Sequence, residues 1–164
     1  MSYRIRQMTS RDYDAVFALW RGTSGIGLDE VCDSRAGIAR YLKRNPSLSF
    51  VACAHEKIVG AILSGHDGRR GYLHHLAVAV SHRKTGFGKA LTARCLDRLG
   101  KLGIPKCNIF VFRSNARGRA FWRHNGWKQR SDLCVMQQKT THASKNDDAA
   151  AHRLPSARGG PGLR

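Results

Sequence analysis

The chain has 164 residues, of which 41% are hydrophobic and 24% are charged. Because domains average ~150 residues, this length predicts one compact domain with at most a tail and excludes a multidomain protein. Lysine and arginine number 29 against 11 acidic residues, which gives a net charge of +18. Such a charge favours a polyanionic partner, and a nucleic acid, a membrane surface and a phosphorylated cofactor all stay open.

The cysteines and the N-terminus indicate a protein of the cytoplasm. The five cysteines are widely spaced and form no C-x-x-C pair, so neither a disulfide framework nor a zinc site is indicated. Residues 1–9 are polar and lack the apolar core of a signal peptide. No apolar run approaches the ~18 residues of a membrane span. We therefore expect a cytoplasmic protein with no bound metal and no membrane-spanning segment.

The first quarter of the chain predicts a strand followed by two helices. Polar and apolar residues alternate over 3–6, and residues 9–12 offer a hydroxyl cap before an apolar pattern with helical spacing over 13–20. A second helix is predicted over 33–44, where apolar residues share one face. It ends before Pro46, because the residue that precedes a proline is biased away from helical geometry.

Three short strands are predicted next. Apolar runs over 49–54 and 57–66 are separated by a polar pair, which is typical of a hairpin. A glycine-containing turn over 67–71 then leads into a strand over 72–80. The three strands are expected to form an antiparallel meander.

The second half predicts a strand–helix–strand unit and further short elements. Their predicted ranges are a helix over 86–102, a strand over 107–112, a helix over 115–125, and two last strands over 127–130 and 134–138. The order implies one parallel crossover in an otherwise antiparallel sheet, which is an α+β class.

The domain is predicted to span residues 1–140. From residue 141 onward the sequence is rich in Ala, Gly, Ser and Arg and contains two leucines as its large apolar residues. Such a composition buries too little surface to offset the entropy of ordering the chain. Residues 141–164 are therefore expected to be a disordered basic tail.

The segment 82–91 carries the clearest chemical signal, since it puts two glycines and three cations between a strand and a helix. Gly86 and Gly88 allow close backbone approach, and the first amides of the helix lie at the positive end of its dipole. Such a turn can bind a phosphate. An ordinary glycine-containing loop is the alternative, and the segment is neither a P-loop nor a dinucleotide-binding fingerprint.

Two ordered motifs resemble the GCN5-related N-acetyltransferase (GNAT) superfamily. Residues 83–88, Arg-Lys-Thr-Gly-Phe-Gly, resemble its acetyl-CoA loop, Arg/Gln-x-x-Gly-x-Gly/Ala. Residues 115–122, Asn-Ala-Arg-Gly-Arg-Ala-Phe-Trp, followed by Gly126-Trp127, resemble its Asn-x-x-Ala/Gly-x-x-Phe/Leu-Tyr/Trp segment. Residues 75–78 resemble the strand that enters the loop, and 66–71 resemble small bacterial members of the YpeA type. The resemblance covers residues 3–139.

The resemblance implies the GNAT fold, which is a mixed, mostly antiparallel sheet of six to seven strands with a central splayed parallel pair and about four helices. It implies that acetyl-CoA is the cosubstrate. Backbone amides over 84–89 would hold its pyrophosphate, and Val78 would bond its pantetheine arm as a neighbouring strand does. Asn115 would bind the cofactor through its amide, although an asparagine there also suits a helix N-cap. The residues implied in cofactor binding are Val78, Arg83, Lys84, Gly86, Phe87, Gly88, Lys89 and Asn115.

The position that often carries a tyrosine general acid in this family is Trp122 here. An indole N–H cannot protonate a thiolate as a phenol does. We therefore expect Trp122 to shape the thioester pocket, while the CoA thiolate departs unassisted or through water.

A proton acceptor for the amine is sought on the predicted strand 72–80. Members that acetylate arylalkylamines carry histidines at the positions of Tyr72 and His74, so His74 is the first candidate, with a satisfied structural histidine as the alternative. Strand alternation places Tyr72 and His74 on one face and His75 on the other, packed under the cofactor helix. Tyr72 would donate a proton or line the pocket, and Asp67 is expected to be a turn residue.

The expected function is transfer of acetyl from acetyl-CoA to a primary amine of a small molecule or peptide, by a monomer or homodimer. One alternative is a catalytically weak module that binds acyl-CoA as a regulatory ligand. Residues 83–130 hold thirteen Lys and Arg against a single acidic residue, Asp97, so a nucleic-acid-associated protein is a further alternative. No interleaved aromatic pattern supports specific nucleic-acid binding.

Overall fold

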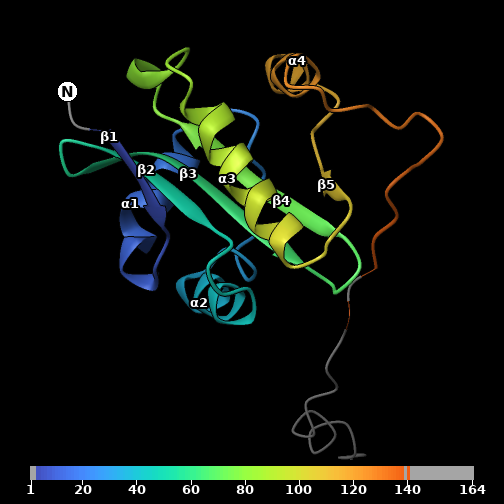
Figure 1. Ribbon diagram of the computed structural model, residues 1–164, viewed down its shortest axis with the longest axis horizontal. Helices are drawn as coiled ribbons and strands as arrows, with labels where there is room; N and C mark the ends of the chain where they lie inside the picture. Colours follow the sequence, from blue (N-terminus) through green and yellow to red (C-terminus); the bar gives the residue numbers. More distant parts are fainter. Residues whose placement is uncertain (1–2, 139, 141–164) are drawn as a thin grey trace, which may run out of the picture. The chain divides into compact units, whose positions relative to one another are not determined.

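The computed structural model describes residues 3–138 and 140 (Figure 1). Residues up to Lys128 belong to one compact unit, and those from Gln129 onward belong to a second. In the second unit the described residues include an ion pair between Arg130 and Asp132 but neither helix nor strand. The predicted tail, 141–164, lies outside the described residues.

The described residues form one five-stranded sheet in the order β1-β2-β3-β4-β5. Its strands are β1 (Tyr3–Gln7), β2 (Phe50–Ala54), β3 (Lys57–His66), β4 (Gly71–Val78) and β5 (Cys107–Ile109). Neighbouring strands are antiparallel except for β4 and β5, which are parallel. The predicted α+β class and parallel pair are confirmed.

The predicted count of six to seven strands is wrong for the described residues, because 127–130 and 134–138 form no strand. A strand needs a partner edge for its backbone groups, and alternation of apolar residues does not supply one. Leu133, Val135 and Met136 stay exposed. The parallel pair therefore lies at an edge of this sheet and not at its centre.

The four predicted helices are present as α1 (Tyr13–Arg21), α2 (Arg35–Arg44), α3 (Phe87–Lys101) and α4 (Ala116–His124). Short 3₁₀ turns precede α1 (η1, Ser10–Asp12) and α3 (η2, Val80–His82). The helix starts follow from caps in the sequence: the Ser34 hydroxyl accepts from the amide of Gly37 at α2, and the Asn115 side chain accepts from that of Gly118 at α4.

Helices cover both faces of the sheet (Figure 1): α1 and α2 lie on one face, and α3 lies across the other. The first face buries a cluster that includes Trp20 of α1 and Ile38 of α2. The second buries a cluster that includes Leu91 and Cys95 of α3. We call these the α1/α2 face and the α3 face. Strand β2 contributes to both clusters, which explains why its sequence is apolar without alternation.

Strand β4 carries a β-bulge that changes which face its residues occupy. The pairing with β3 shifts between Ala61 and Leu63, and His75 has a positive φ of 53°. Leu73 belongs to the α3-face cluster, whereas Ala77, four residues later, belongs to the α1/α2-face cluster. In a regular strand both would share a face, so the bulge has inserted one extra residue.

The bulge overturns the predicted placement of His75 under the cofactor helix. The His75 ring lies 5.0 Å from the ring of Trp20 in α1, centroid to centroid. The His74 ring lies 6.0 Å from that of Tyr41 in α2. Both histidines thus face the α1/α2 side, because alternation fails where a strand has an extra residue.

The parallel ladder between β4 and β5 is short. It pairs Gly71 with Cys107, Tyr72 with Asn108 and Leu73 with Ile109, and β5 ends there. The strand predicted over 107–112 is therefore shorter than expected. From His74 onward, β4 has no paired strand on this side among the described residues, which leaves backbone groups of β4 available at this edge.

Candidate active site

The loop predicted to bind the cofactor lies between η2 and α3. Lys84 and Gly86 both have positive φ, 62° and 91°, so the chain turns sharply before the helix begins. The Thr85 hydroxyl donates to the His82 carbonyl at 2.6 Å and closes this turn. At the helix start, the Ala90 amide donates to the Gly86 carbonyl at 2.9 Å.

The four amides before Ala90 have no acceptor within α3, because an α-helix leaves its first four N–H groups without an intrahelical partner. They belong to Gly86, Phe87, Gly88 and Lys89. They lie at the positive end of the helix dipole, with Lys84 and Lys89 nearby in the chain. The loop can therefore bind an anion such as a pyrophosphate.

The two glycines of the loop are required for different reasons. A Cβ at Gly86 would meet no atom within 4 Å, so its positive φ is what favours glycine there. A Cβ at Gly88 would lie 3.1 Å from the ring of Phe121 in α4. Gly88 thus lets α4 pack against the start of α3, a structural role that the sequence did not reveal.

Arg83 links the loop to the end of β4, since its Nε donates to the Val78 carbonyl at 3.1 Å. Val78 also pairs with Gly60 in β3. The Val78 carbonyl is therefore occupied within the protein, and its predicted bond to the pantetheine arm stays a prediction.

Asn115 occupies the N-cap position of α4, which is the alternative to its predicted role in cofactor binding. Its Oδ1 accepts from the Gly118 amide at 2.8 Å, and its Nδ2 donates to the Gly25 carbonyl at 3.4 Å. The second bond joins α4 to the connection between α1 and α2. A Cβ at Gly27 in the same connection would lie 2.6 Å from the Phe112 ring. This connection, residues 22–34, therefore packs against the segment after β5. We call it the acceptor loop, since the amine acceptor is expected to bind at the first two helices and the glycine-rich link between them.

Trp122 packs on the α3 face. Its ring makes edge contacts with Trp127 at 4.9 Å and with Phe121 at 5.1 Å, and both tryptophans pack against the α3-face cluster. The structure thus shows a packing role for the indole. The ring contacts of Trp122 are with Phe121 and Trp127, and none of them is with His74. The predicted position of Trp122 beside the thioester stays a prediction.

Tyr72 and His74, two of the predicted catalytic residues, lie in one group of aromatic rings. The rings of Tyr72, His74 and Phe110 lie 6.3–6.5 Å from one another, centroid to centroid, and Tyr41 meets His74 edge-on. Phe110 directly follows β5, so the group forms where β4 and β5 part. Burial raises the pKa of Tyr41 above its usual range, so this phenol stays protonated.

Burial lowers the pKa of His74 below its usual value, and the neighbouring His75 lowers it further. The imidazole of His74 is therefore neutral at pH 7 and can accept a proton. The Tyr72 hydroxyl donates to Oδ2 of Asp67 at 3.4 Å. Oδ1 of Asp67 accepts from the amides of Arg69 and Arg70, which confirms Asp67 as a turn residue.

One buried pair beside His74 was not predicted from the sequence. Nε2 of His75 lies 2.8 Å from Oδ1 of Asp33, whose side chain is 8% exposed. Oδ2 of Asp33 accepts from the Asp29 amide at 2.8 Å. Asp33 comes from the acceptor loop, 42 residues from His75. The one local signal is the pair of aspartates four residues apart in a glycine-rich connection.

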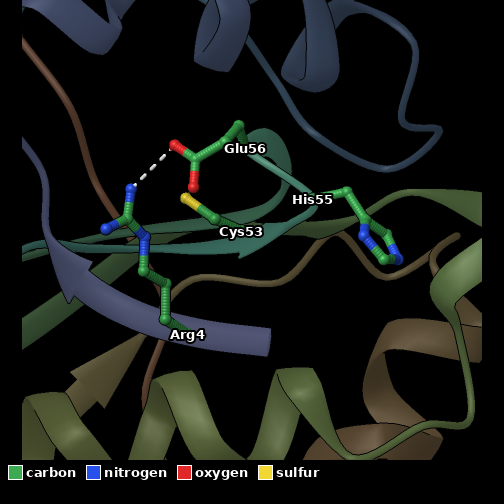
Figure 2. Close-up of a pocket in the computed structure, with 4 residues that line it drawn as sticks. All are labelled: Arg4, Cys53, His55 and Glu56. Atoms are coloured by element: carbon green, nitrogen blue, oxygen red, sulfur yellow. Dashed lines mark hydrogen bonds and ion pairs between the residues drawn. The ribbon is translucent and has the colours of Figure 1, made fainter. Parts of the chain in front are cut away.

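Two hollows in the surface share no residue with the cofactor loop. The first, about 40 Å³, is lined by Arg4, Cys53, His55 and Glu56, and Figure 2 shows the Glu56 carboxylate bonded to the Arg4 guanidinium across it. It is too small for a cofactor, because ligand pockets span ~300–1,000 Å³. The second, about 340 Å³ and open to solvent, is lined by Cys32, Gly37, Arg40, Tyr41 and Arg44. Tyr41 connects it to His74.

The described residues contain no group of three or more His, Cys, Asp or Glu side chains placed to hold a metal ion. None of their helices combines the length and the apolar character that crossing a bilayer needs.

Comparison with known proteins gives consistent matches. The family model of the acetyltransferase (GNAT) family matches residues 11–127. An acetyltransferase of Yersinia pestis is 35% identical over 111 residues, which are 68% of this chain and 77% of that protein. One from Pectobacterium atrosepticum is 33% identical over the same shares.

A solved structure, that of the PaiA N-acetyltransferase from Thermoplasma acidophilum in complex with coenzyme A, resembles the fold with a TM-score of 0.70. It is 23% identical, and the match covers 78% of this chain and 91% of that one. The family match includes both motif segments, 83–88 and 115–122, and the bulged strand β4. The chain therefore belongs to the GNAT family of acetyltransferases.

Proposed function

We propose that the protein transfers the acetyl group of acetyl-CoA directly to a primary amine of a small molecule or peptide, with His74 as the proton acceptor. The observation that carries this proposal is the arrangement around β4. A neutral, half-buried imidazole lies on the strand where its parallel partner ends, and the anion-binding loop follows the same strand.

Acetyl-CoA, bound along this strand, would supply the activated thioester. The amides of residues 84–89 would hold its pyrophosphate, with charge from Arg83, Lys84 and Lys89. Gly86 and Gly88 would allow the close backbone approach, with the amide of Phe87 between them. The edge of β4 beyond His74, which pairs with no strand among the described residues, would accept the pantetheine arm. Asn115 would contact the cofactor from the start of α4.

The chemistry requires an amine nitrogen that has lost its proton. In the proposed reaction the nitrogen attacks the thioester carbon, a C–N bond forms, the C–S bond breaks, and the nitrogen's proton passes to His74. The CoA thiolate leaves unassisted or takes a proton from water. Tyr72, whose ring stacks on His74, is the second candidate for a proton donor or for lining the acceptor site.

A second candidate function is a module that binds acyl-CoA without efficient turnover. Trp122, in place of a phenol, and its packing against Trp127 favour this candidate. Thiol release by the purified protein over a panel of primary amines separates the two. Amine-dependent release supports the transferase, whereas tight acetyl-CoA binding with no release over the whole panel supports the binding module.

The cofactor loop is tested by replacing one glycine of positive φ at each end of α3. Gly86→Val strains the N-terminal loop and should abolish the acetyl-CoA binding that calorimetry is expected to detect in the micromolar range in the wild type. Gly103→Val is the control, because Gly103 also has a positive φ and open space around it, at the other end of the helix. Normal affinity in Gly86→Val would contradict the proposed loop.

We further infer a cytoplasmic location. All five cysteines are free thiols, a state that a reducing compartment maintains. Fractionation of the cells that make the protein tests this location.

A further inference from the structure

Asp33 is buried, and groups from three parts of the chain hold its side chain and its backbone carbonyl. Its Oδ2 accepts the Asp29 amide, its Oδ1 faces Nε2 of His75, and its backbone carbonyl accepts the Tyr13 hydroxyl at 2.9 Å. These contacts connect the acceptor loop, β4 and α1. Asp33 is therefore held rigidly at the point where the acceptor loop meets the bulge.

Within the described part of the chain, the ionic partner of Asp33 is a histidine and not a permanent cation. A buried carboxylate that faces no permanent cation has lost the stabilisation of water without gaining that of a fixed positive charge. Such a group favours any positive charge that arises beside it. The site proposed for acetyl transfer produces one, because His74 becomes an imidazolium when it accepts the proton.

The bulge in β4 places the His75 ring, and with it the Asp33 carboxylate, on the same face of the sheet as His74. His75 has its backbone in the left-handed region, which is unusual for a residue other than glycine and is found at functional sites. Its ring packs 5.0 Å from Trp20 and 6.3 Å from the ring of His74. Without the extra residue, His75 would point to the opposite face and could contact neither Asp33 nor Trp20.

We propose that Asp33 and His75 form a positioning pair that keeps the His74 imidazole in place and balances the proton that His74 accepts from the amine. Through a proton on Nε2, His75 donates to Oδ1 of Asp33. The carboxylate supplies the negative charge, and the His75 ring joins it to the ring group that contains His74. This inference rests on the proposed function of His74.

Other polar groups surround the pair and His74. Tyr72 of β4 and Tyr41 of α2 face His74, and burial keeps the phenol of Tyr41 protonated. In the acceptor loop, the Asp29 carboxylate accepts the amides of Val31 and Cys32. The charges of Asp29, Asp33 and Arg40 act on the Cys32 thiol, whose pKa is raised, chiefly by its hydrogen bond with Asp29.

The direction of each charge effect on His74 makes the pair testable. Burial lowers the pKa of His74 most, the neighbouring His75 lowers it further, and the Asp33 charge raises it. Removing the carboxylate should therefore lower the pKa of His74, whereas removing the second imidazole should raise it. A role limited to packing would not produce shifts of opposite sign.

The experiment is a pH titration of the histidine ring signals by NMR, with labelled histidine, in the wild type, Asp33→Asn, His75→Gln and Asp14→Asn. Asp14 is an exposed aspartate of α1, paired with Arg35, and serves as the matched control. We expect the pKa of His74 to fall in Asp33→Asn, to rise in His75→Gln and to stay unchanged in Asp14→Asn. Unchanged values in both pair variants would overturn the proposal.

The same variants are assayed for thiol release with an amine that the wild type accepts. Asp33→Asn should lower kcat by about tenfold or more while the KM for acetyl-CoA stays constant, as expected for a carboxylate that acts through another residue. If the wild type turns over no amine, the proposed function fails, and the NMR titration still decides whether the pair controls His74. If Asp33→Asn does not fold, His75→Gln carries the test.

Discussion

Two aspartates are buried among the described residues, Asp12 and Asp33, and their partners differ in kind. Asp12, at the end of η1, faces Arg6 of β1 through two bonds, Nη1 to Oδ2 at 2.8 Å and Nη2 to Oδ1 at 2.7 Å. Asp33 faces a histidine. Arg6 stays charged at any pH of interest, whereas an imidazole changes its charge near neutrality.

The two pairs also differ in how the chain brings them together. Arg6 and Asp12 are six residues apart, and Asp12 also accepts the amide and hydroxyl of Thr9, so this pair stabilises a local turn. The pair of Asp33 and His75 spans 42 residues and lies beside the proposed proton acceptor. A permanent ion pair stabilises the fold, whereas a titratable pair can take part in chemistry.

The largest expected effect is on turnover. His74→Ala should lower kcat by about a hundredfold while acetyl-CoA affinity stays normal, because a general base contributes ~10²–10⁴ in rate. In the wild type, kcat should fall as the pH drops through a pKa below 6.5, since burial lowers the pKa of His74 and only the neutral ring accepts a proton. A pH–rate profile by thiol release measures both, and equal rates in wild type and variant would leave water or Tyr72 as the acceptor.

The second-largest expected effect is on the stability of the fold, through the ion pair of Arg6 and Asp12. Arg6→Ala should lower the free energy of unfolding at pH 7 by about 2 kcal/mol, less than the ~3–5 of a fully buried pair, because the Arg6 side chain is 35% exposed. The matched control is Arg4→Ala on the same strand. It breaks the exposed pair with Glu56 and should cost at most about 0.5 kcal/mol. Urea unfolding of both variants measures the difference, and equal costs would remove the contrast between buried and exposed pairs.

Acid should remove the contribution of the permanent pair. The Arg6 guanidinium holds the pKa of Asp12 below its usual value of 3.8, so the folded state binds this proton less readily than the unfolded one. The resulting stability is fully present above about pH 4 and is lost as the pH falls through the lowered pKa. The gap in unfolding free energy between the wild type and Arg6→Ala should therefore narrow below pH 4. A gap that widens there would show that Arg6 stabilises the fold by another route.

The smallest expected effect is on the free energy of unfolding when the pair of Asp33 and His75 is changed. Asp33→Asn keeps an oxygen for the Asp29 amide and an amide that can donate to His75, so it should cost under about 1 kcal/mol. Asp12→Asn loses a two-bond charged contact with Arg6 and should cost more. Thermal melts of the two variants compare them. If Asp33→Asn is the more damaging, Asp33 has a structural role and the comparison fails.

The chain sequence by itself determined the elements whose signals are local. The hydroxyl cap over residues 9–12, the cap at Asn115 and the stop before Pro46 lie within a few residues of the helix ends that they mark, and the apolar spacing of each helix is also local, so all four helices were predicted. The cofactor loop is likewise contiguous, since Gly86 and the first amides of α3 follow one another in the chain. Backbone conformation at such sites depends mainly on neighbouring residues.

Only the tertiary structure decided the number of strands and the contacts around His75. The two C-terminal strands were predicted from alternation, but a strand forms only where another strand offers a free edge. The bulge at His75 depends on how β4 pairs with β3, and one inserted residue reverses every later side chain. Asp33 meets His75 because α1 and the sheet bring residues 42 apart into contact. Contacts of this kind depend on packing between distant segments, which no pattern within either segment records.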